Sequence, residues 1–93
     1  MSMSPHETRL RKVRMRAWHR GMKEMDLILG RFVDANLARM DDASLDAFEA
    51  MMDENDQDLY LWVTGARPAP AQHAAILARI AKDAGITPAT ESP

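Results

Sequence analysis

Apolar side chains recur every three to four residues along most of this chain, which is the spacing of one face of an α-helix. The strongest repeat lies over residues 22–37, where the apolar positions are Met22, Met25, Ile28, Leu29, Phe32 and Val33. Gly30 lies inside this repeat, although glycine in a helix costs about 1 kcal/mol relative to alanine. The repeat therefore predicts a helix over residues 22–37 that packs closely against another helix at Gly30.

An earlier helix is predicted to begin at Pro5. Ser4 is a good N-cap, proline suits the first helical position, and Glu7 lies three residues after the cap, so these residues form a capping box. Gly21 interrupts the helical spacing of the apolar positions that follow, which are Leu10, Val13, Ala17 and Trp18. We expect the arginines between these positions to form a stripe that faces solvent or a partner.

Three further helices are predicted after residue 40. Asp41 is a good N-cap for the first of them, and Gly65 and Gly85 are placed to end the other two. The last helix is expected to start near Ala71. The first carries Leu45, Phe48, Met51 and Met52 on one face, the second has an apolar surface of Leu59, Tyr60, Trp62 and Val63, and the last is expected to face inward with Ile76, Leu77 and Ile80. No useful stretch alternates with a period of two, so we predict an all-α fold, a compact bundle of five short helices.

The length of 93 residues suits one domain with one modest core. We assign residues 1–86 to this domain and residues 87–93 to a flexible C-terminal tail. The absence of cysteine excludes disulfides, thiolate catalysis and zinc-thiolate sites. No apolar run reaches the roughly 18 residues of a membrane span, and the N-terminus lacks the apolar stretch of a secretory signal. We expect a soluble cytoplasmic protein without membrane insertion.

Charge is distributed unevenly along the chain. Residues 1–33 carry eight basic and three acidic side chains, whereas residues 34–58 carry one basic and nine acidic side chains. Such segregation suits steering toward a charged partner. Alternatively, the two segments neutralise one another within the fold. The sequence leaves both interpretations open.

Candidate chemistry is sparse. His6, His19 and His73 lie far apart in sequence and offer no His-x-x-x-His pair for a metal. The acidic run over residues 53–58 lacks the central glycine and terminal glutamate of a calcium loop, so we expect a solvated turn between helices. Glycine is too rare for a dinucleotide-binding fold. We therefore predict no catalytic, metal-binding or cofactor-binding residues, and no autonomous enzyme.

One motif is more informative. Arg20, Gly21 and Glu24 form the pattern Arg-Gly-x-x-Glu, followed by the helical repeat and, further along, by the segment Asp58-Leu-Tyr-Leu-Trp62. The combination resembles the succinate dehydrogenase assembly factor family, small proteins that promote flavinylation of the flavoprotein subunit of that enzyme. The resemblance covers roughly residues 9–82 and agrees with the chain length.

The resemblance implies a five-helix fold with a docking face around the motif. It implies binding to the flavoprotein subunit of succinate dehydrogenase, with that of fumarate reductase as a second client. A client histidine would bond to FAD, so the FAD would remain with the client and no cofactor would bind stably here. The predicted partner-binding residues are Arg20, Gly21, Glu24, Arg14 and Lys23. No nucleic-acid partner is expected, and a monomer is the simplest oligomeric state.

The residue types of the motif suit docking. On a continuous helix Arg20 and Glu24 would share one face, and Gly21 would let the backbone of another chain approach. Arg20 could then donate to a partner carboxylate or carbonyl. The alternative is a kink between helices with a surface ion pair worth about 0–1 kcal/mol.

A different class of function is also open. The basic stretch from Arg9 to Arg20 would suit a regulatory or nucleic-acid-binding module, similar to an antitoxin. The acidic second third of the chain and a sequence pI near 5.8 oppose this alternative.

Overall fold

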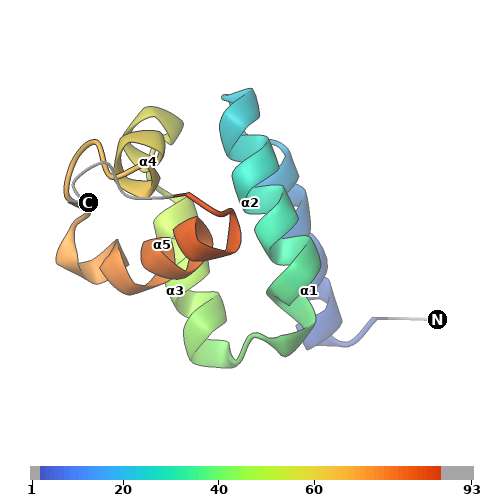
Figure 1. Ribbon diagram of the computed structural model, residues 1–93. Coiled ribbons are helices and arrows are strands. Elements are labelled where there is room, and N and C mark those ends of the chain that lie inside the picture. Colours follow the sequence, from blue (N-terminus) through green and yellow to red (C-terminus); the bar gives the residue numbers. More distant parts are fainter. Residues whose placement is uncertain (1–2, 87–93) are drawn as a thin grey trace.

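The computed structural model describes residues 3–86, and its regular elements are helices throughout that range (Figure 1). The all-α fold class and the five-helix bundle are therefore confirmed. The predicted tail over residues 87–93 lies outside the described residues. The elements are α1 (Pro5–Trp18), α2 (Lys23–Asn36), the 3-10 helix η1 (Leu37–Arg39), α3 (Asp42–Met52), α4 (Asp56–Val63) and α5 (Ala71–Asp83).

The predicted helix ends are confirmed by their hydrogen bonds. Ser4 Oγ accepts from the Glu7 backbone N–H at 3.1 Å, and Glu7 Oε1 accepts from the Ser4 N–H at 3.5 Å, which completes the capping box. The Asp41 carboxylate caps α3 by accepting from the Ser44 N–H at 2.8 Å. Gly65 and Gly85 follow α4 and α5 with φ of 79° and 72°, a region that favours glycine.

Helices α1 and α2 form an antiparallel hairpin, with α3, α4 and α5 packed to one side of it (Figure 1). The hairpin is tight where Trp18 crosses Gly30. A Cβ added at Gly30 would lie 2.6 Å from Trp18 Cε3, much closer than a real contact permits. The predicted close packing at Gly30 is confirmed, because the indole occupies the space that a side chain would need.

Helix α2 lies at the centre of the fold, where it contacts α1, α4 and α5. Its buried residues meet those of the other helices in one apolar core, which includes Val13, Ala17, Met25, Leu29, Phe32, Val33, Leu45, Phe48, Met51, Leu59, Val63 and Ile80. No helix in residues 3–86 is long and apolar enough to cross a membrane.

Most basic side chains of α1 are exposed, as expected of the stripe, but Arg9 and Arg16 form ion pairs with acids of the second third of the chain. Arg9 bonds to Asp46 at 2.5 Å and also to Glu49, and Arg16 bonds to Asp53 at 2.8 Å. These ion pairs join the basic first third of the chain to the acidic second third across the α1–α3 contact. They support the neutralising interpretation of the charge pattern, and they weaken the case for a phosphate-tracking face.

Candidate functional site

The Arg-Gly-x-x-Glu motif spans the joint between α1 and α2. Helix α1 ends at Trp18 and α2 begins at Lys23, so Arg20 and Gly21 lie in the connecting loop and Glu24 lies in the first turn of α2. The break between helices that Gly21 predicted is confirmed, so Arg20 and Glu24 do not share the face of one continuous helix. The reason is that the backbone N–H groups of the loop bond to side chains: that of Arg20 donates to the Asp26 carboxylate, and those of Gly21 and Met22 donate to Asp56.

The Arg20 guanidinium points into the fold. Its Nε donates to Asp56 Oδ1 at 2.6 Å, its Nη1 to the Met52 carbonyl at 2.8 Å and its Nη2 to the Glu54 carbonyl at 2.9 Å. Its side chain is only 12% exposed. Because Met52 is the last residue of α3, the guanidinium also satisfies a carbonyl at the end of that helix, where a positive charge is favourable. The ion pair of Arg20 is therefore with Asp56 and is largely buried, unlike the surface pair that the alternative interpretation expected.

Asp56 is the central acceptor of this cluster. Its Oδ1 accepts from Arg20, and its Oδ2 accepts from the N–H groups of Gly21 at 2.6 Å and Met22 at 3.0 Å. Burial acts to raise the pKa of this carboxyl, but the hydrogen bonds from Arg20, Met22 and Gly21 outweigh burial and hold the pKa below its ordinary value. Asp56 is therefore a charged acceptor at neutral pH.

An open hollow of about 610 Å³ lies above this cluster. It is lined by Gly21–Glu24 from the loop and α2, and by Asn55–Gln57 from the start of α4. We call this surface the motif hollow. Gly21, Lys23, Glu24, Asn55 and Gln57 are all exposed on it. Three of the five predicted partner-binding residues therefore meet here.

Gly21 has no internal reason to be glycine. Its φ is not in the left-handed region, and an added Cβ would meet only Asp56 Oδ2, at 3.4 Å, which is an ordinary contact distance. An exposed glycine is also the residue that lets another backbone come closest.

A second groove adjoins the motif hollow. It has a volume of about 480 Å³ and lies between α2, α4 and the end of α5, with apolar lining from Leu27, Ile28, Tyr60 and Ile86. Glu24 lines both this groove and the motif hollow, so it occupies the boundary between a polar and an apolar depression.

A family model described as "Flavinator of succinate dehydrogenase" matches residues 11–84. The chain belongs to this family. The matched range includes both sides of the motif hollow, the loop after α1 and the start of α4. The family that the motif indicated in the sequence is thereby confirmed.

Individual relatives agree with this assignment. The chain is 35% identical to the FAD assembly factor SdhE of Acetobacter pasteurianus over 79 residues, which cover 84% of this chain and 72% of that protein. It is 39% identical to the protein of the same name from Legionella pneumophila over 46 residues, 50% of this chain and 58% of that protein. It is 37% identical to the mitochondrial succinate dehydrogenase assembly factor 2 of Mycosarcoma maydis over 68 residues, 73% of this chain and 29% of that protein. The chain spans less than half the length of the fungal relatives that it matches.

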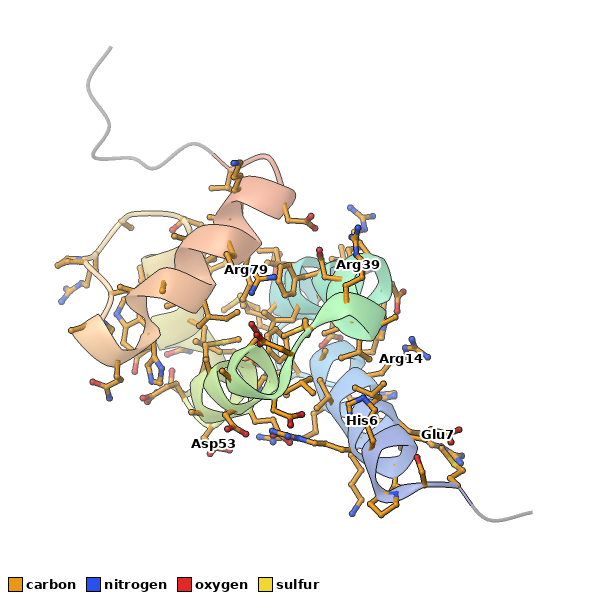
Figure 2. All side chains as sticks on the ribbon, turned by 90° about the horizontal axis from the view of Figure 1, so that it is seen from below. His6, Glu7, Arg14, Arg39, Asp53 and Arg79 are labelled. Atoms are coloured by element: carbon orange, nitrogen blue, oxygen red, sulfur yellow. The ribbon has the colours of Figure 1, made fainter. Side chains whose placement is uncertain are left out.

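Arg14 lies apart from the motif hollow. It projects from α1 on the side away from α3, and its Nε lies 3.5 Å from Asp34 Oδ1 near the end of α2 (Figure 2). The motif hollow is at the opposite end of α2. The fold therefore does not bring Arg14 together with Gly21, Lys23 and Glu24.

Asp56 and its neighbours Asn55 and Gln57 line the motif hollow but were not among the residues predicted from the sequence. Asn55 is the N-cap of α4, and its side chain accepts from the Asp58 N–H at 2.9 Å. Because asparagine is a preferred N-cap residue, the sequence alone could have predicted a helix start at Asp56. The pairing of Asp56 with Arg20 could not be predicted from the sequence, because 36 residues separate the two.

A metal site would require several of the described histidines and acids to lie together. Within residues 3–86 no three His, Cys, Asp or Glu side chains gather closely enough to hold a metal ion. His6 and His19 are exposed, whereas His73 is buried and its Nε2 lies 2.8 Å from Glu54 Oε2. The acidic run over residues 53–58 was expected to be a solvated turn, but Glu54 and Asp56 pair within the fold.

Proposed function

We propose that this protein docks on the flavoprotein subunit of succinate dehydrogenase and promotes the covalent attachment of FAD to that subunit. Family membership supports the client, and the environment of Gly21 supports the docking face. An exposed glycine with room for a methyl group and no positive φ is best explained by a contact outside the chain. That glycine belongs to the motif, so the client would approach at the motif hollow.

The polar residues around Gly21 suit this role. Lys23 and Glu24 are exposed and line the hollow at the start of α2, where a cation and a carboxylate can pair with client groups of opposite charge. Glu24 is exposed beside the apolar groove as well, so a client segment that covers it can bury apolar surface at the same time. We place the centre of the docking face here and not at Arg14.

The factor need not supply a catalytic group. In our proposal a histidine of the client forms the bond to FAD, the FAD stays in the client, and the factor acts as a monomer. By binding one client conformation better than others, the factor increases the population of the conformation in which that bond forms. Such a helper must leave once the client matures.

The release of the factor from the mature client suggests what replaces it. We infer that the factor and the iron–sulfur subunit compete for the same client surface, and that the flavoprotein of fumarate reductase is a second client. Size-exclusion chromatography of the flavoprotein with both proteins present should give two separate binary complexes. A stable ternary complex would contradict the competition.

Covalent flavin in the client tests the proposed function. The flavoprotein subunit is expressed in cells that lack their own factor, and covalent flavin is read as fluorescence in a denaturing gel. We expect a band that depends on this protein and fades with Glu24→Ala. Asp42→Ala is the matched control, because Asp42 is also an exposed acid in the first turn of a helix, but on α3. Equal bands with and without the factor would contradict the proposal.

A further inference from the structure

Asp56 connects the two sides of the motif hollow, although it lies outside the Arg-Gly-x-x-Glu motif. It is the first residue of α4, and it accepts hydrogen bonds from three consecutive residues of the α1–α2 loop. Its side chain is 13% exposed and that of Arg20 is 12% exposed, so water screens this pair little. The cluster therefore fixes where the loop lies relative to α4.

The start of α2 depends on this contact. Met22 is the N-cap residue of α2, and its own side chain makes no capping hydrogen bond. Unsatisfied N–H groups at a helix start require an acceptor, and a negative charge is the most favourable one there. The Asp56 carboxylate supplies a negative charge from α4 and accepts from the N–H of the N-cap Met22 and from that of Gly21 just before it.

The same geometry limits what Arg20 can do. Each of its three guanidinium nitrogens already donates to an acceptor inside the chain. The two remaining guanidinium N–H groups belong to a side chain that is only 12% exposed, and a client carboxylate that took over the three existing bonds would displace Asp56 or uncover the carbonyls of Met52 and Glu54. Uncovering buried carbonyls and leaving a charge unpaired would each cost free energy. The guanidinium is thus engaged inside the chain and not offered to a partner.

We propose that Asp56 is a positioning residue for client docking, which holds the exposed segment Gly21–Glu24 in the shape that the client binds. Arg20 acts through Asp56 and does not touch the client. This inference rests on the proposed function and divides the motif into two parts: Gly21 and Glu24 meet the client, and Arg20 orients them.

Two aspartate variants separate this role from a general effect of charge. Asp56→Asn keeps the size of the side chain but puts an amide where three donors converge. Asp53→Asn is the matched control. It removes the ion pair between Arg16 of α1 and Asp53, whose side chain is 75% exposed. This substitution does not change the contacts of the Gly21 loop. Affinity for the isolated flavoprotein subunit is measured at a temperature where each variant is folded, together with covalent flavin at saturating factor.

We expect Asp56→Asn to weaken client binding by about tenfold or more, because the client must then order a loop that the wild-type chain already holds in the bound shape. Covalent flavin should return to the wild-type level when the factor is in excess, because the chemistry belongs to the client. Asp53→Asn should bind as the wild type does. If Asp56 has a purely structural role, Asp56→Asn would lower the melting temperature and leave the client affinity of the folded chain unchanged. That result would overturn the inference. Equal loss of client affinity in both variants would also overturn it.

A measurement on the wild-type chain covers the case in which Asp56→Asn does not fold. The Arg20 Nε–H and the amides of Gly21 and Met22 are followed by nitrogen-15 NMR as the client is added. We expect the Arg20 Nε–H to keep its position and slow exchange, because its bond to Asp56 persists in the complex. A large shift with fast exchange would show that Arg20 leaves Asp56 for the client. If the wild type does not bind the flavoprotein at all, the proposed function fails first.

Discussion

Two glycines nine residues apart in the α1–α2 hairpin have opposite surroundings. Gly30 is buried under the Trp18 indole, where a Cβ would overlap the ring. Gly21 is exposed at the rim of the motif hollow, where a Cβ would fit at an ordinary contact distance. Neither glycine has the positive φ that most often demands this residue.

The difference assigns the two glycines to different tasks. Gly30 is required by the packing of this chain, because two helices cannot approach as closely with a side chain between them. The packing of this chain does not require Gly21, and in our proposal this glycine serves the client that binds there. Stability and docking are therefore expected to separate, with one glycine controlling each, and substitutions can test that separation.

The largest effect is expected from Gly30→Ala. The added methyl group displaces the Trp18 ring, and overpacking of this kind costs about 1–3 kcal/mol in free energy of unfolding, more than the helix-propensity gain returns. Urea denaturation measures it. In a Trp18→Ala background the obstacle is gone, so the same substitution should instead stabilise by about 1 kcal/mol. The same sign in both backgrounds would contradict the packing explanation.

Gly21→Ala should weaken client binding without lowering stability, in contrast to Gly30→Ala. The free energy of unfolding should stay the same or rise by about 0.4–1 kcal/mol, because alanine restricts the unfolded chain and fits the folded one. Client affinity should fall by about tenfold, since the methyl group keeps the client backbone at a distance. Titration calorimetry with the flavoprotein subunit provides the affinity. Unchanged affinity would mean that Gly21 is outside the docking face.

The buried pair below Gly21 predicts a pH dependence that the Gly30 region lacks. The pKa of Asp56 is lowered in the folded chain, so its contribution to stability is complete above its unfolded pKa of about 4 and is lost as the pH falls through the folded value. Asp56→Asn cannot titrate. The difference in unfolding free energy between wild type and Asp56→Asn should therefore be constant near neutral pH and shrink below about pH 4. A difference that stays constant in acid would contradict the charged pair.

The smallest effect is expected from the exposed pair between Arg16 and Asp53. Their side chains are 41% and 75% exposed, and exposed ion pairs contribute about 0–1 kcal/mol. Asp53→Asn should change the urea midpoint only slightly at low salt and less at high salt. A loss as large as that of Asp56→Asn would mean that burial does not distinguish the two pairs.

Local features of the fold were predictable from the sequence. The Ser4 and Asp41 caps, the glycines after α4 and α5, and the close packing at Gly30 all depend on neighbouring residues or on one helix. The pairing of Arg20 with Asp56 depends on how α4 lies against the α1–α2 loop. Many acids of the second third of the chain were equally plausible partners, and only the tertiary arrangement selects Asp56. The break at Gly21 was predictable from the apolar spacing, but the direction of the Arg20 side chain in that break was not.

The most direct test of the docking face is site-specific crosslinking to the client. A photo-crosslinking side chain replaces exposed Lys23 at the motif hollow or, as the control, exposed Ala38 in η1. Lys23 is the first residue of α2 and Ala38 follows its last turn, so a helix about 20 Å long, at 1.5 Å per residue, separates them. The account predicts that position 23 crosslinks to the flavoprotein subunit of succinate dehydrogenase and that position 38 does not. Crosslinking from position 38 without crosslinking from position 23 would contradict it.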